Sequence, residues 1–159
     1  MEFDYTAYVV RVLHMVGAAL FVGGVLYAAV GAAPLAKRVD KDARPDFMLA
    51  AQKRSYRLLH PAMLLLLVTG LMQYATGMES YSEIGSRMHM VIGTKMLIAL
   101  VAFFILVAQT ARLIKKGQVR WWLAMGVLGL VVIVLASYAR AVRLGFLENA
   151  AAGAAAGGG

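Results

Sequence analysis

Four long stretches with few charged residues limit what this chain can fold into. They cover about residues 9–36, 55–77, 88–111 and 120–141. Crossing a bilayer core about 30 Å thick takes roughly 20 helical residues. Because backbone facing lipid must satisfy its own hydrogen bonds, helices are the only structure that such stretches can form there. The sequence therefore predicts an all-α membrane protein, a four-transmembrane-helix bundle, inserted as a multi-pass protein in a lipid bilayer.

Composition agrees with this prediction and narrows the function. Hydrophobic residues make up 62% of the 159 residues and charged residues 15%, whereas about a quarter of the residues in a soluble domain are charged. The formal charge of +8 is typical of topology signals in membrane proteins, and no other feature indicates nucleic-acid binding. Since the chain has no cysteine, disulfides, thiolate metal sites and covalent haem attachment are excluded.

Basic residues predict the orientation. Eleven of the sixteen lysines and arginines lie on the side of the first and third connections, which places that side in the cytoplasm and both termini on the periplasmic side of a bacterial inner membrane. We expect one transmembrane domain over residues 1–145, followed by a passive or irregular Ala/Gly-rich tail over 146–159. We also expect a polar loop over 77–85 and a tight basic turn over 115–120.

All three histidines lie in or at the edge of predicted spans, and ionisable groups within a membrane mark functional sites by default. His14 and His89 both lie near the periplasmic boundary, at depths within one helical turn of each other. His60 lies at the cytoplasmic boundary, just before Pro61, where a structural or interfacial role is the main alternative. His14 and His89 are therefore the predicted pair of ligands, with His60 as the alternative.

Haem b suits a pair of histidines on facing helices, because two imidazoles can ligate one iron axially. Gly17 and Gly24 share the helix face of His14 and would leave a flat groove for a macrocycle. Small residues are also common at ordinary helix contacts, so that alternative stays open.

Three cations near the same boundary are candidates for binding haem propionates, which prefer guanidinium or ammonium partners. They are Arg11, Lys95 and Arg140. Lys95 is the only charged residue in its span, so a functional role is expected for it, with snorkelling to the interface as the alternative.

Three segments carry a resemblance to known families. RVLHMVGAALFVGGVLY, RSYRLLHPAMLLLLVTGLM and GTKMLIALVAFFILVA resemble the first three helices of the bacterial haem-containing protoporphyrinogen oxidases and of the related copper resistance protein D family. The resemblance implies a four-helix membrane fold, with His14 matching the first-helix histidine and Lys95 the third-helix lysine. The chain departs from the oxidases at Phe21, where they have tryptophan, and at Gly93, where they have histidine.

The leading hypothesis is a b-type haem protein in electron transfer, alone or as a membrane subunit that works with other membrane or periplasmic redox subunits. One alternative is an enzyme like protoporphyrinogen oxidase, with Lys95 and Arg11 binding substrate carboxylates. A non-catalytic structural subunit and a copper-handling protein are the others. Whether the chain is an enzyme is left open by the sequence.

Overall fold

The computed structural model describes residues 4–84, 86–111 and 118–157. These residues form helices and short connections, with no strand among them. Four helical segments are long and apolar enough to cross a membrane, and they are Tyr5–Ala36, Arg44–Gly77, Met88–Thr110 and Val119–Phe146. Among the described residues, the predictions of an all-α fold and of four helices long and apolar enough to cross a membrane are confirmed.

The first span combines three helical pieces. α1 (Tyr5–Leu26) begins at Asp4, whose Oδ1 accepts a hydrogen bond from the Ala7 amide at 2.9 Å, as expected of an aspartate at a helix N-cap. The helix then widens into a π-helix, η1 (Tyr27–Ala32), and closes with α2 (Ala33–Ala36). Because π-helices are rare and often occur at functional sites, the surroundings of η1 are a candidate location for one.

Arg44 connects the first span to the second. Its guanidinium donates to the carbonyl of Ala36 at 2.9 Å, of Lys37 at 3.2 Å and of Val39 at 3.4 Å. Because the last carbonyls of a helix have no partner within the helix, this side chain satisfies groups that would otherwise be unpaired. α3 (Arg44–Ile84) starts at the same residue, with Pro45 in its first turn, and continues through Pro61.

α3 continues past the end predicted for it. Gly77 to Ile84 is helical, so the prediction of a loop over 77–85 is wrong for these residues, and Gly85 lies outside the described residues. α4 (Ser86–Thr110) follows. Of the predicted basic turn over 115–120, residues 115–117 lie outside the described residues. Gln118 to Arg120 are helical and belong to α5 (Gln118–Gly157).

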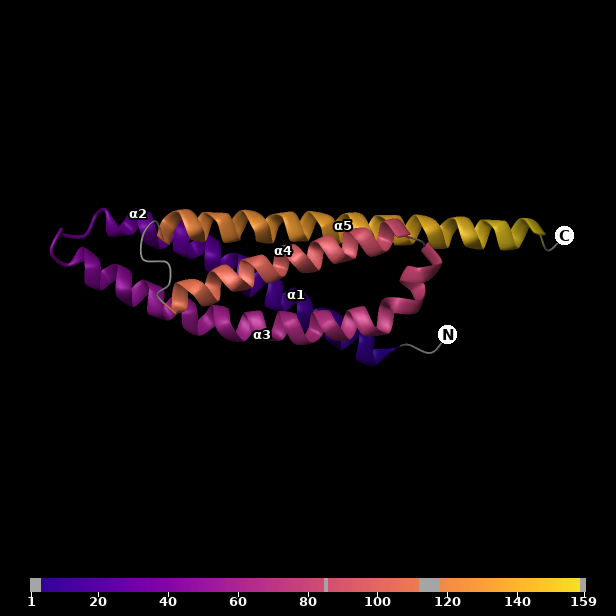
Figure 1. Ribbon diagram of the computed structural model, residues 1–159, viewed down its shortest axis with the longest axis horizontal. Helices are drawn as coiled ribbons and strands as arrows, with labels where there is room; N and C mark the ends of the chain where they lie inside the picture. The colour runs from indigo at the N-terminus through magenta and orange to yellow at the C-terminus, as the bar shows by residue number, and fades with distance from the viewer. Residues whose placement is uncertain (1–3, 85, 112–117, 158–159) are drawn as a thin grey trace.

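The C-terminal tail is helical as far as Gly157, which corrects the expectation of an irregular segment. Alanine has the highest helix propensity of all residues. A helix that enters the tail from the preceding span therefore needs no tertiary contact to continue through alanines. Figure 1 shows this last part of α5 projecting beyond the other helices.

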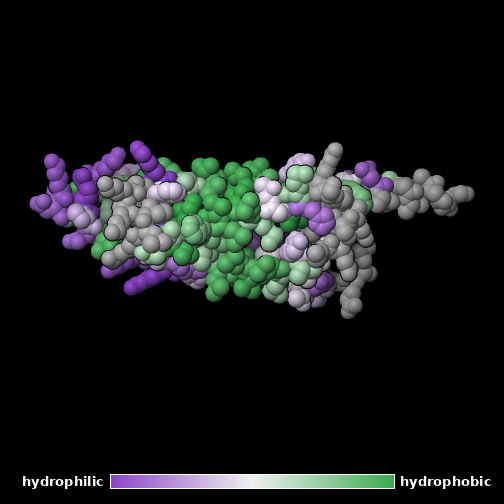
Figure 2. All heavy atoms as spheres, viewed as in Figure 1, coloured by the Kyte–Doolittle hydropathy of each residue, from purple (hydrophilic) through white to green (hydrophobic). Residues whose placement is uncertain are grey.

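The four spans run antiparallel, and both chain ends lie at the same end of the bundle (Figure 1). We call this the terminal end, and we call the opposite end, which carries Lys37, Arg38, Lys41, Lys53 and Arg54, the basic end. Figure 2 shows an apolar belt around the middle of the visible face, between hydrophilic ends. This pattern is that of a protein whose middle faces lipid.

Close packing of α1 on α3 dominates the bundle. A Cβ atom at Gly17 would lie 3.2 Å from Cγ of Leu66, and one at Gly24 would lie 3.0 Å from Cδ2 of Leu59. The two glycines thus let the helix backbones approach each other, as small residues do in membrane helices. Across the bundle, the ring of Phe21 on α1 meets that of Phe103 on α4 edge to face, with centroids 5.3 Å apart.

Candidate functional site

The site predicted from the sequence centres on His14, which lies in the terminal half of the bundle. Its imidazole is half-buried and faces α3, where its Nδ1 lies 2.8 Å from the Thr69 hydroxyl oxygen. A Cβ atom at Gly70 would lie 3.3 Å from Cε1 of His14. The absence of a side chain at position 70 therefore makes room for the ring against the backbone of α3.

Hydrogen bonding at Thr69 determines which nitrogen of His14 carries the proton. Thr69 is buried, and its hydroxyl donates to the Leu65 carbonyl at 2.6 Å. Because a hydroxyl has one proton, its oxygen can only accept from His14, so the Nδ1 of His14 is the protonated nitrogen. Nε2 then keeps its lone pair. A histidine held through Nδ1–H in this way has the arrangement found behind metal-ligating imidazoles.

Lys95 of α4 is the charged side chain that acts on His14. Its side chain is half-buried within the span. Among the residues that the structure describes, Lys95 has no hydrogen bond or ion pair. A charge in a membrane span costs roughly 2.5–3.5 kcal/mol on insertion scales, so Lys95 is a cation that an anionic ligand would stabilise.

Gln73, one turn beyond Thr69 on α3, adds an unsatisfied donor. Its amide nitrogen is buried without a hydrogen-bond partner among the described residues. An unpaired buried amide destabilises a fold by about 1–3 kcal/mol. We define the His14 cluster as His14, Thr69, Gln73 and Lys95; it offers a lone-pair nitrogen, a cation and an amide donor.

The other predicted residues are placed differently. His89, Arg11 and Arg140 have exposed side chains on α4, α1 and α5. α1 packs side by side with α3 and α5, whereas it meets α4 across the core. The hydrogen-bond partner of His14 in the structure is therefore Thr69 on α3. The role of His89 as an iron ligand stays a prediction.

The predicted groove beside Gly17 and Gly24 contains leucine side chains of α3. In this structure the two glycines serve the contact between α1 and α3. Their role against a macrocycle also stays a prediction.

His60 belongs to a second polar cluster, toward the basic end. His60 is the only member of this cluster that the sequence analysis predicts as a candidate site residue. Its Nδ1 donates to the Tyr56 carbonyl at 2.8 Å, and its Nε2 lies 3.4 Å from the Thr110 hydroxyl. The Tyr56 hydroxyl accepts from the Gln52 amide at 2.6 Å and donates to Oε1 of Gln109 at 3.5 Å.

Trp122 completes this group by stacking on Tyr56, with ring centroids 5.6 Å apart and planes 20° apart. We define the Tyr56 cluster as Gln52, Tyr56, His60, Gln109 and Trp122. One signal in the sequence could have indicated it: Gln52 and Gln109 are amide side chains in or beside apolar spans, where polar groups need partners.

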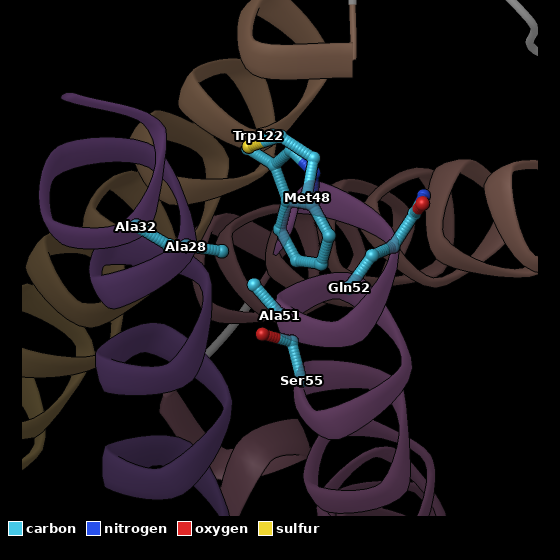
Figure 3. Close-up of a pocket in the computed structure, with 7 residues that line it drawn as sticks. All are labelled: Ala28, Ala32, Met48, Ala51, Gln52, Ser55 and Trp122. Carbon is cyan, nitrogen blue, oxygen red and sulfur yellow. The ribbon is translucent and has the colours of Figure 1, made fainter. Parts of the chain in front are cut away.

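A small open hollow adjoins the Tyr56 cluster (Figure 3). Ala28 and Ala32 of η1 form one wall, and Ala51, Ser55 and Trp122 lie opposite. The hollow thus brings together the π-helical segment of the first span, the start of the second and the start of the fourth.

No group of three or more His, Cys, Asp or Glu side chains gathers anywhere in the described parts of the chain. A haem iron differs from a zinc ion in needing only one or two protein ligands, because the porphyrin supplies four. Comparisons with protein-family models, with curated protein sequences and with solved structures find no match for this chain.

Proposed function

We propose that this chain is a haem b protein of a bacterial inner membrane that transfers electrons, with His14 as an axial ligand of the iron. The observation that carries the proposal is the hydrogen-bond chain from His14 through Thr69 to the Leu65 carbonyl. These two hydrogen bonds hold the imidazole in one orientation and leave Nε2 with its lone pair, which is the form that binds iron.

The residues around His14 fit a haem in two further respects. Lys95 is a half-buried cation without a partner among the described residues, and propionate carboxylates pair with such groups. The unpartnered amide nitrogen of Gln73 is a second donor for a carboxylate. Haem iron, when bound, supplies one-electron transfer by cycling between its ferrous and ferric forms.

The surroundings of His14 also suit such a role physically. The imidazole lies within a span of the bundle and is half-buried. Burial in an apolar environment is one of the means by which a protein tunes the potential of a redox group. We propose that the partners are other membrane or periplasmic redox subunits at the terminal end, which we place on the periplasmic side.

A reduced-minus-oxidised spectrum of the protein, expressed with an ample supply of haem and purified in detergent, tests the proposal. We expect an α-band in the cytochrome b region. His14→Ala should lose it, while His60→Ala, which changes a histidine at the other end of the bundle, should keep it. His89→Ala tests the predicted second ligand. The absence of an α-band in the wild-type protein, or an unchanged band in His14→Ala, would overturn the proposal.

A further inference from the structure

The outer face of α3 changes from apolar to basic as the helix nears the basic end. Leu64, Val68 and Leu71 are exposed side chains of this span, at a depth where exposed apolar groups face acyl chains. At 3.6 residues per turn, Lys53 and Arg57 lie within about 20° of Leu64 around the helix axis. Both are exposed. The stripe that faces lipid in the middle of the span therefore ends in two cations.

Arg54 adds a third exposed cation, one turn from Arg57 and about 80° around the axis from Leu64. None of the three cations makes a hydrogen bond or an ion pair with another described residue. The nearest acidic residue along α3 is Asp46, which lies about 10 Å from Lys53 in the direction away from the span. The described part of the chain thus provides no counter-ion for these three charges.

The depth of the three cations is that of lipid headgroups. The stretch of α3 from Leu58 to Gly77 contains no Asp, Glu, Lys or Arg, and its length of about 30 Å matches the thickness of the hydrocarbon core. Measured from the middle of this stretch, Arg57 lies about 16 Å away and Lys53 about 22 Å. The headgroup layer occupies about the same depths, from about 15 to about 22 Å from the middle of a bilayer.

Other exposed cations are arranged differently. Lys37, Arg38 and Lys41 lie between α2 and α3, so no lipid-facing stripe of a helix leads to them. At the terminal end, Arg11 and Arg140 belong to two different helices. Figure 2 shows the hydrophilic side chains of the basic end next to the apolar belt. The three cations of α3 combine a shared helix, a headgroup depth and an adjoining apolar stripe.

We propose that Lys53, Arg54 and Arg57 bind the phosphate of an anionic phospholipid whose acyl chains lie along Leu64 and Val68. Guanidinium groups bind phosphate oxygens in pairs, and basic clusters at the ends of membrane helices bind anionic headgroups. Charge complementarity favours an anionic lipid over a zwitterionic one, and the apolar stripe favours a lipid over free phosphate. The proposal does not rest on haem at His14.

Native mass spectrometry of the detergent-solubilised protein tests the proposal. It measures the Kd for phosphatidylglycerol and for phosphatidylcholine with the same acyl chains. The wild type should bind phosphatidylglycerol at least about tenfold more tightly. Replacing the three cations together, as Lys53→Gln, Arg54→Gln and Arg57→Gln, should raise the Kd for phosphatidylglycerol about ten- to hundredfold. The Kd for phosphatidylcholine should change by less than about threefold, because the apolar stripe is unchanged.

The matched control replaces Lys37, Arg38 and Lys41 by glutamine together. It removes the same charge from the same end of the bundle, and its Kd for phosphatidylglycerol should stay within about threefold of the wild type. Arg54→Lys combined with Arg57→Lys keeps the charge and should keep the preference for the anionic lipid. Circular dichroism checks folding, and if the triple variant of α3 is not folded, Arg57→Gln alone decides, with an expected rise of about three- to tenfold.

Three results would overturn the proposal. Equal Kd values of the wild type for the two lipids would show that the headgroup charge is not recognised. Equal effects of the two triple variants would show that only the total charge of the basic end matters. Displacement of phosphatidylglycerol by an excess of inorganic phosphate would show that the ligand is a phosphate ion and that the acyl chains contribute nothing.

Discussion

A threonine hydroxyl has a single proton, and in this protein the use of that proton determines what His14 can do. Thr69 gives its proton to the Leu65 carbonyl and accepts from the Nδ1 of His14. The imidazole therefore offers Nε2 alone as a ligand. A substitution at position 69 changes the hydrogen bonding of His14 while His14 itself stays the same. Thr69 therefore acts as a positioning residue for the proposed iron ligand.

Replacing Thr69 by valine keeps the volume and removes the hydrogen-bond acceptor. Loss of the bond makes the imidazole a weaker donor to ferric iron, so the midpoint potential of the bound haem should rise. One hydrogen bond of about 0.5–1.5 kcal/mol corresponds to roughly 20–60 mV for one electron. Spectroelectrochemical titration measures the shift.

Thr76→Val is the matched control for this change. Thr76 lies on the same helix and makes the same kind of intrahelical bond, at 3.0 Å to the Met72 carbonyl, but its side chain is exposed. Its potential should equal that of the wild type. Equal potentials for the two variants would show that Thr69 does not act on the haem.

The sequence indicates His14 and Lys95 as candidates because charged or ionisable side chains are costly in a membrane span. It does not indicate Thr69 or Ser55 in the same way. Serine and threonine are frequent in membrane helices and usually bond to their own backbone. Only the packing of α1 on α3 shows that Thr69 meets a histidine and that Ser55 faces a hollow.

At the scale of whole helices, the packing of α5 against α1 depends on one glycine of α5. A Cβ atom at Gly129 would lie 2.8 Å from Cγ2 of Val22, and valine has little rotamer freedom with which to move away. Gly129→Ala should therefore destabilise the bundle by about 1–3 kcal/mol. Unfolding in detergent mixtures of increasing SDS content, followed by circular dichroism, measures the difference.

Gly23→Ala is the control for this prediction. Nothing lies within 4 Å of a Cβ atom at Gly23, and alanine favours a helix over glycine by roughly 1 kcal/mol. This variant should be as stable as the wild type or more stable. If both alanine variants unfold at the same SDS fraction, the close contact between α1 and α5 is not a determinant of stability.

The connection between the first two spans depends on Arg44. Arg44→Gln should lose most of the three hydrogen bonds to the carbonyls at the end of α2 and just after it and reduce stability by about 1–2 kcal/mol. Arg38→Gln changes an exposed arginine on the same connection and should have little effect. The same SDS titration compares them, and equal effects would contradict a capping role for Arg44.

Element ends are harder to predict than element cores. Glycines and polar residues after residue 77 indicate a loop, but α3 is helical up to Ile84. Such residues have only modestly lower helix propensity, so a long preceding helix can extend through them. The alanine-rich tail differs from its prediction for another reason, because residues without side-chain functions still form a helix when one leads into them.

At the scale of the whole molecule, the four spans can be predicted from hydrophobic length alone. Which spans pack against each other cannot be predicted in this way. Matching depths suggest that His14 on α1 faces His89 on α4. The structure places α1 beside α3 and α5, and α1 meets α4 across the core, where the ring of Phe21 contacts that of Phe103. Depth along the membrane normal can be read from a sequence, whereas rotation and neighbour choice depend on side-chain packing between helices.

Orientation in the membrane is testable because the chain has no cysteine. Single cysteines replacing Asp42, in the first connection, and Glu148, beyond the fourth span, probe the two ends. In intact spheroplasts, a membrane-impermeant maleimide should label Glu148→Cys but not Asp42→Cys, because the basic connections are expected in the cytoplasm. Labelling of Asp42→Cys alone would reverse the proposed orientation.

His14→Gly tests the central claim most directly. Removing the imidazole leaves space for free imidazole to enter from solution and replace it. We predict that purified His14→Gly lacks the cytochrome b spectrum, and that haem added together with imidazole restores it, while imidazole has no such effect on His60→Gly. A wild-type spectrum in His14→Gly without imidazole would contradict His14 as the ligand of the iron.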